Sequence, residues 1–286
     1  MPLAKKGKVQ IILALLCSAS ALVAQPSVRV DSLFSPSLSK TMRYTVILPQ
    51  KYDPHRQYPL LYLLHGYGGG HTDWTVRTKL LRYISDIPLI VVMPDAENSW
   101  YLNSPVRPSQ RFEDYIANDL RDHLVQRYPV DTTRQAFAGL SMGGYGAVML
   151  ALRHPQQFRF AGSLSGALSF SREVTDSSSQ IGKLAAASFR SLYADSSVAR
   201  LRTIQSAYDI FQLVQTSHDT LPYFYLVMGT ADGYREFLPS HRDFTALLRS
   251  RHLPYEYHET PGVHNWLYWD REIQPLLVRL RAVLHF

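Results

Sequence analysis

The residues best suited to chemistry are grouped around one serine. Ser141 lies in a Gly-Leu-Ser-Met-Gly segment at 139–143, which has the pattern Gly-x-Ser-x-Gly. A strand-like apolar run over 134–141 ends at this serine, and a helical pattern over 144–155 follows it. A strand, a tight turn and a helix in this order hold a serine in an exposed, strained position where it can act as a nucleophile. The alternative is a glycine-rich turn with an incidental serine.

A serine hydroxyl needs a base, and His264 is the best placed of the eleven histidines. It lies in the Pro-Gly loop "TPGVHNWLYWD", after a strand-like run at 254–259 and before the last helical pattern. Loops at the carboxyl ends of strands commonly carry catalytic groups in α/β proteins. His241 and His252 fall within a helical pattern, where we expect them on the solvated surface.

The acid that would orient this histidine is expected between the serine and the histidine in the chain. Asp232 follows the apolar run "YFYLVMG" directly, which places it at a strand end. Asp209 and Asp219 lack a preceding strand, and Asp270 lies too close to the histidine loop. The alternative for Asp232 is a plain Asp-Gly turn.

Backbone amides would stabilise the oxyanion of such a reaction. The first candidate is the amide of Met142, at the start of the helix after the serine. The second is the amide of Tyr67 in "LYLLHGYGGGHTDW" (61–74), with Gly66 or Gly68 as alternatives. The histidines of this segment have no set of carboxylates at ligand spacing, so we expect no metal and no cofactor.

Short apolar runs alternating with helical patterns must position these groups. Such runs, bounded by Gly or Pro, are typical of strands buried on both faces of a parallel sheet. They predict an α/β fold with a mostly parallel central sheet flanked by helices. The expected strands are 42–49, 58–66, 87–95, 134–141, 221–230 and 254–259, and the expected helices are 112–128, 144–155, 240–252 and 272–286.

The segment from about 169 to 218 interrupts this alternation. A serine cluster at 176–179 is followed by two helical patterns, over 181–194 and 198–214. We expect a small helical cap inserted over the carboxyl edge of the sheet. Ordinary crossover helices are the alternative.

Residues 1–24 have the pattern of an export signal peptide, so residues 25–286 would form the mature domain. Three lysines precede an apolar run that is short for a membrane span and ends in small residues. We expect cleavage after Ala24, with Ala21 as the competing site, and a periplasmic or secreted protein without stable membrane insertion. A lipid anchor on Cys17 is disfavoured because bulky Leu16 precedes it.

The charge and cysteine content narrow the classes of partner. The formal net charge of +7 includes the three lysines of residues 1–24, so the remaining chain carries +4. This small excess is dispersed, and it does not indicate nucleic-acid binding. The single cysteine lies in the expected signal peptide, which excludes a disulfide or a thiol nucleophile in the mature chain.

Five segments together resemble the esterase D family of α/β-hydrolases: "LLHGYGGGHTDW", "MPDAENSWY", "GLSMGGYGA", "GTADGYREF" and "GVHNWLYWD". The resemblance extends from about residue 30 to the end and is weakest in the expected cap. It implies an α/β-hydrolase fold, a triad of Ser141, Asp232 and His264, and oxyanion amides at Tyr67 and Met142. The family includes S-formylglutathione hydrolases, tributyrin-type, feruloyl and acetyl-xylan esterases, and mycolyltransferases.

The favoured hypothesis is an exported serine carboxylesterase acting on small-molecule or carbohydrate-linked esters. Trp100, Tyr101 and Trp266 are expected to form an aromatic wall for the substrate, whereas Trp269 is expected in the core. The alternatives are an acyltransferase that moves the acyl group to a sugar hydroxyl, and a binding protein without turnover on the same scaffold.

Overall fold

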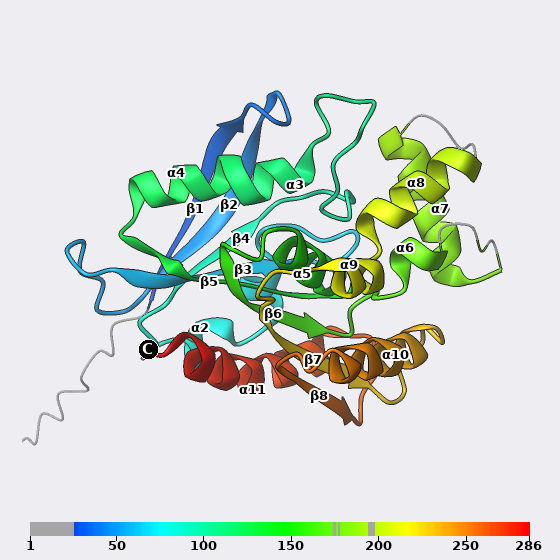
Figure 1. The fold of residues 1–286 in the computed structure, drawn as a ribbon. Coiled ribbons are helices and arrows are strands. Elements are labelled where there is room, and N and C mark those ends of the chain that lie inside the picture. Colours follow the sequence, from blue (N-terminus) through cyan, green and yellow to red (C-terminus); the bar gives the residue numbers. More distant parts are fainter. Residues whose placement is uncertain (1–25, 174–175, 177, 194–197) are drawn as a thin grey trace, which may run out of the picture.

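The computed structural model describes residues 26–173, 176, 178–193 and 198–286. A twisted sheet of eight strands lies at its centre, in the order β1-β2-β4-β3-β5-β6-β7-β8 (Figure 1). Strands β3 to β8 are parallel, and β2 runs antiparallel to both β1 and β4. The strands are β1 (Ser27–Ser35), β2 (Lys40–Leu48), β3 (Tyr58–Leu64), β4 (Ile90–Pro94), β5 (Val130–Leu140), β6 (Phe158–Leu164), β7 (Tyr223–Gly229) and β8 (Tyr255–Thr260). The predicted mostly parallel sheet is thus confirmed.

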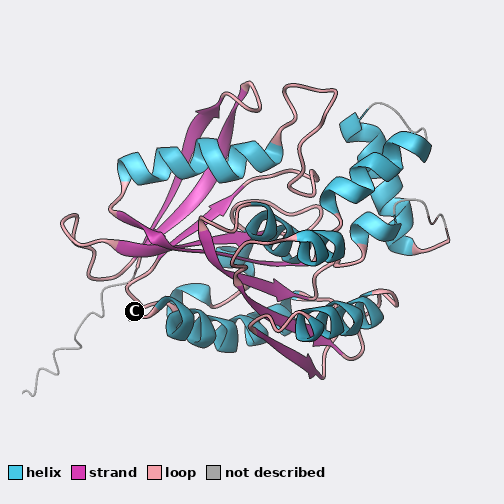
Figure 2. Cartoon of the chain, viewed as in Figure 1, coloured by secondary structure: helices cyan, strands magenta, loops and turns pink. Residues whose placement is uncertain are grey.

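Helices cover both faces of the sheet, which explains why its central strands consist largely of apolar residues (Figure 2). Every residue of β3 and β4 is buried. Two strands, β1 and β6, were not expected from the sequence. In β6 the apolar run is broken by Gly162 and Ser163, and a Cβ at Gly162 would lie 2.7 Å from Leu276 Cδ1. A close approach of the last helix therefore explains this glycine.

The sheet separates the core into two clusters of buried side chains. Side chains of α4 (Arg121–Arg127), α5 (Met142–Arg153) and α10 (Phe237–Ser250) belong to one cluster. Those of α1 (Asp73–Arg77), α2 (Leu80–Tyr83) and α11 (Trp266–Leu284) belong to the other. The helix expected at 112–128 begins as α3 (Phe112–Asp114) and continues through a π-helical stretch, η1 (Tyr115–Leu120), into α4.

Helices α6 (Phe170–Glu173), α7 (Gln180–Tyr193) and α8 (Val198–Tyr208) gather at one end of the molecule, beyond the sheet (Figure 1). Ile181, Ala185 and Phe189 are spaced four residues apart on α7 and are buried, so they share its inner face. The next helix, α9 (Ile210–Thr216), differs, because Phe211 packs edge-on against Phe244 of α10 at 5.1 Å. Within 169–218, α9 therefore belongs to the layer that flanks the sheet.

The expected signal peptide, residues 1–24, lies outside the described residues. Among the helices of the described ranges, none combines the length and the apolar character that a membrane span requires.

Candidate active site

Ser141 occupies a strained turn between β5 and α5. Its φ of +52° and ψ of −117° are unusual for a residue with a side chain. The glycines on either side leave room for this turn. A Cβ at Gly139 would lie 2.4 Å from the Gly143 carbonyl oxygen, and one at Gly143 would lie 2.6 Å from the carbonyl oxygens of Leu64 and His65. The two glycines therefore let the turn approach the end of β3.

Backbone hydrogen bonds hold the serine from the neighbouring strand. The amide of Ser141 donates to the Leu164 carbonyl at the end of β6 (3.0 Å). The Ser141 carbonyl accepts from the amides of Ala167 (3.1 Å) and Tyr145 (3.1 Å). Strain at a single residue persists when its surroundings fix it in this way.

The three residues predicted to form a triad lie in one hydrogen-bonded row. Nε2 of His264 is 3.0 Å from Oγ of Ser141, and Nδ1 is 2.8 Å from Oδ2 of Asp232. Asp232 follows β7, and His264 lies in the loop between β8 and α11. The Asp232 side chain is 1% exposed and that of His264 is 15% exposed, so the carboxylate lies beneath the imidazole.

Further contacts fix the orientation of the acid and the imidazole. The other carboxylate oxygen of Asp232, Oδ1, accepts a hydrogen bond from the Tyr234 amide (3.0 Å). The rings of Tyr234 and Trp269 meet the His264 ring at centroid distances of 4.8 and 4.9 Å, both in T-shaped geometry. Asn265 caps α11, where its side chain accepts from the Tyr268 amide (3.0 Å). The histidine loop is therefore constrained on both sides.

The glycine-rich loop after β3 lies against the serine. A Cβ at Gly66 would be 3.4 Å from Cβ of Ser141. The amide of Gly68 donates to Oδ1 of Asn98 (2.6 Å), and that of Gly69 donates to the Gly66 carbonyl (3.1 Å). The amides of Gly66 and Tyr67 donate no hydrogen bond to the described part of the chain. This arrangement leaves the amides of Tyr67 and of the alternative Gly66 available, and it engages that of the other alternative, Gly68.

Met142 is the first residue of α5, directly after the serine. Amides in the first turn of a helix have no partner within the helix, and the helix dipole makes that end favourable for negative charge.

His65 joins the loops that follow β3 and β4, a role that the sequence did not indicate. It is 1% exposed, its Nδ1 donates to the Gly66 carbonyl (2.8 Å), and its Nε2 accepts from the Ala96 amide (3.0 Å). Burial lowers its pKa, which favours the neutral ring that this pairing requires. No group of three or more residues able to hold a metal ion occurs within the described ranges.

A cavity of about 310 Å³ opens over the serine. It is lined by Gly66, Tyr67, Gly68, Gly69, Asp73, Arg77, Trp100, Leu140, Ser141, Ile181, Leu184, Tyr234, His264, Trp266 and Trp269. Two of the three expected substrate contacts, Trp100 and Trp266, therefore lie in its wall. Helix α7 contributes Ile181 and Leu184, so the cap, which consists of helices α6 to α8, closes one side of the cavity.

Two aromatic residues differ from the expectation. Tyr101 is fully buried behind the cavity, where its hydroxyl donates to the His65 carbonyl (2.8 Å) and its ring fills the space that Gly146 leaves open. It holds the loop after β4, and we correct its placement among the substrate contacts. Trp269 is 6% exposed, as expected of a core residue, but it also lines the cavity.

His241 also departs from the expectation. It is fully buried in α10, where Nδ1 donates to the Phe237 carbonyl (2.8 Å). The expectation of a surface position was wrong because His241 lies on the inner face of α10, which packs on the sheet. A helical pattern alone does not tell which face a residue occupies.

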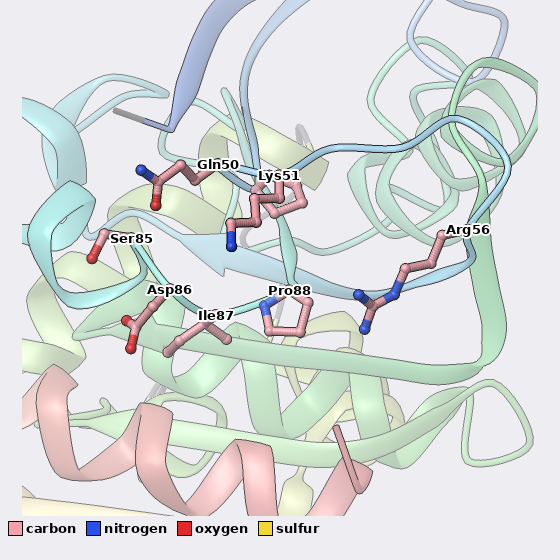
Figure 3. A pocket seen from close by; sticks show the side chains of 8 residues that line it. Gln50, Lys51, Arg56, Ser85, Asp86, Ile87 and Pro88 are labelled. Atoms are coloured by element: carbon pink, nitrogen blue, oxygen red, sulfur yellow. The ribbon is translucent and has the colours of Figure 1, made fainter. Parts of the chain in front are cut away.

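A second cavity, of about 270 Å³, lies at the opposite end of the central strands (Figure 3). Lys51, Arg56 and Asp86 surround it, between the end of β2 and the starts of β3 and β4. It contains no nucleophile paired with a base, and the row of serine, histidine and aspartate belongs to the first cavity.

Comparisons with known proteins identify the family of the chain. A family model named Esterase, described as "Putative esterase", matches residues 35–280. An acetyl esterase of Caldicellulosiruptor saccharolyticus is 27% identical over 261 residues, which cover 85% of this chain and 93% of that protein. An esterase of Mycobacterium tuberculosis is 30% identical over 243 residues, which cover 77% of this chain but 51% of that protein.

Solved structures show the same fold. An S-formylglutathione hydrolase from Agrobacterium tumefaciens superposes with a TM-score of 0.78 at 20% identity, covering 91% of this chain and 96% of that one. A ferulic acid esterase superposes with a TM-score of 0.72 at 22% identity, covering 91% of this chain and 99% of that one. At these identities the likeness concerns the fold, which is that of the α/β-hydrolases.

Proposed function

The chain belongs to the esterase family and is a carboxylesterase, and we propose that Ser141, His264 and Asp232 are its catalytic triad. One observation carries this proposal. The two nitrogens of a single imidazole lie at 3.0 Å from Ser141 Oγ and 2.8 Å from Asp232 Oδ2. A base held between a hydroxyl and a buried carboxylate can remove the hydroxyl proton and remain stabilised as an imidazolium.

The proposed reaction proceeds in two halves. His264 Nε2 takes the proton of Ser141 while Oγ forms a bond to the ester carbonyl carbon, and the resulting oxyanion accepts hydrogen bonds from the amides of Tyr67 and Met142. The C–O bond to the alcohol then breaks, and the alcohol leaves with the proton from His264. Water, deprotonated by the same nitrogen, releases the acid from the acyl-enzyme.

For the substrate we propose short-chain esters, including esters linked to carbohydrates. The cavity of about 310 Å³ is small, and the partly exposed ring of Trp266 in its wall offers an apolar surface. The acetyl esterase relative supports a small acyl group.

The test is a series of 4-nitrophenyl esters of increasing chain length, together with acetylated xylan and a feruloyl ester. Wild type, Ser141→Ala and Ser250→Ala should be compared, since Ser250 is an exposed serine at the end of α10. We expect the Ser141 variant to lose at least about three orders of magnitude in kcat and the Ser250 variant to retain wild-type rates. Full activity in Ser141→Ala would reject the proposed mechanism. Activity on the nitrophenyl esters but not on xylan would restrict the substrate to small esters.

We further propose that the protein is exported and acts in the periplasm or outside the cell. The support is the basic and then apolar pattern of residues 1–24. Cell fractionation and amino-terminal sequencing of the mature protein test this. We expect a mature chain that begins after Ala24, whereas a cytosolic protein that retains these residues would contradict export.

A further inference from the structure

Arg77 contributes a positive charge to the wall of the catalytic cavity. It is the last residue of α1, and its side chain is 56% exposed. Of the described residues that line this cavity, it is the only lysine or arginine. A cation in the wall of this cavity is a feature that ester hydrolysis itself does not require.

The position of Arg77 is tied to both catalytic loops. Trp74 on α1 donates its indole N–H to the carbonyl of Leu64, at the end of β3 (3.1 Å). The Trp74 ring meets that of Trp266 edge-on at 5.5 Å, and the Arg77 guanidinium lies over the Trp266 ring at 5.7 Å. Because Trp266 comes two residues after His264, the arginine lies on the histidine side of the cavity.

The guanidinium of Arg77 retains donors for a ligand. Its nearest carboxylate oxygen is Oδ1 of Asp73, at 3.6 Å from Nε, which is longer than a hydrogen bond. The other oxygen of Asp73 accepts from the Gly70 amide (3.1 Å). Within the described ranges no residue accepts a hydrogen bond from Arg77, although a guanidinium carries five N–H donors. This cation is therefore restrained in position but available to bind an anion.

The chemistry of the site indicates which part of an ester would meet this cation. His264 delivers the proton to the leaving oxygen, so the alcohol part departs on the histidine side. The lining residues Trp100, Ile181 and Leu184 carry no charge. We propose that Arg77 binds an anionic group on the alcohol part of the ester. The preferred substrates are then esters in which a hydroxyl group of a hydroxy acid or a uronic acid is acylated while its carboxylate stays free. This inference rests on the proposed triad.

The test compares two acetyl esters that differ in one charge, 4-acetoxybenzoate and its methyl ester. The ratio of their kcat/KM values measures the preference for the anion, and comparing this ratio between variants cancels the intrinsic reactivity of each ester. We expect Arg77→Gln to lower the ratio about fivefold, and Arg77→Lys to lower it less, because the charge remains but the planar donors are lost. We expect Asp73→Asn to raise it, since the competing carboxylate is neutralised while an oxygen acceptor for Gly70 remains.

Arg82→Gln is the matched control, because Arg82 is also exposed but does not line the cavity. We expect its ratio to equal that of wild type. If Arg77→Gln leaves the ratio unchanged, even with an equal loss of activity on both esters, the inference is overturned. That result would not contradict the proposed triad. Failure of the proposed triad would be recognised by a different result, namely activity that persists in Ser141→Ala.

Discussion

Nδ1 of His264 donates to Oδ2 of Asp232 at 2.8 Å, and this bond leaves Nε2 as the acceptor that faces Ser141. The imidazole is thereby held in the tautomer that can remove a proton from the serine. The carboxylate is almost completely buried, so little water competes for the bond.

Replacing Asp232 with asparagine should preserve the size of the side chain but favour the wrong tautomer. We expect kcat to fall by about four orders of magnitude at pH 7, as the same exchange does in serine proteases. Steady-state hydrolysis of 4-nitrophenyl acetate measures this effect. Asp219→Asn, at an exposed aspartate that bonds Gln156, is the control and should behave as wild type. Comparable rates in both variants would remove Asp232 from the triad.

Asn98 positions the loop that carries Tyr67. Its side-chain oxygen accepts from the Gly68 amide at 2.6 Å, so Asn98→Ala should loosen the loop without touching the reacting atoms. We expect kcat to fall roughly tenfold with a smaller change in KM, because a misplaced oxyanion donor weakens transition-state binding. Asn98→Asp keeps an acceptor oxygen and should recover most of the rate. If Asn98→Asp is as slow as Asn98→Ala, the hydrogen bond from Gly68 to this side chain does not position the loop.

The buried His241 should make stability depend on pH. Burial lowers its pKa from 6.5 to about 4, so between these values the unfolded chain binds a proton that the folded chain does not. Stability therefore falls as the pH falls from 6.5 towards 4, by about 3 kcal/mol for this one group. Urea unfolding of His241→Phe between pH 7 and 4 should show a shallower decline than wild type. His55→Gln, at an exposed histidine, is the control and should keep the wild-type slope.

A buried hydrogen bond joins helix α7 of the cap to the loop after β4. The Trp100 indole N–H donates to Oγ of Ser188 on α7 (2.9 Å), and the Trp100 ring stacks on Phe170 of α6 at 3.5 Å. Ser188→Ala should leave the indole unpaired and reduce the free energy of unfolding by about 1–3 kcal/mol.

A double-mutant cycle separates this bond from packing. Trp100→Phe removes the donor and keeps a ring, so the pair of substitutions should destabilise less than the sum of the single ones. Measured additivity would show that the two side chains do not interact.

The sequence indicated most of the fold and the members of the candidate site, because both depend on local patterns. Apolar runs followed directly by Ser141, Asp232 or an amide-rich turn marked strand ends, and the ends of parallel strands meet at one edge of a sheet. The structure brings these residues together as that rule requires. Strand β1 was missed because its first four residues are exposed, so no buried run marked it.

Contacts between loops could not be predicted from the sequence in the same way. Asn98 and His65 act on partners in another loop or on a neighbouring backbone, and no periodicity in the chain records such a bond. Tyr101 was misplaced for a related reason: both it and Trp100 have positive φ, so adjacent side chains follow neither strand alternation nor helical spacing. Both side chains are buried, and of the two only Trp100 lines the cavity.

The backbone clamp on Ser141 also bears on how such enzymes could diversify. Its partners at and just after the end of β6, Leu164 and Ala167, come before the first cap helix in the chain. The helices that follow up to Tyr208 can therefore be lengthened, shortened or exchanged without replacing a residue that holds the nucleophile. Evolution could reshape the side of the cavity that Ile181 and Leu184 now form while the catalytic turn is inherited unchanged.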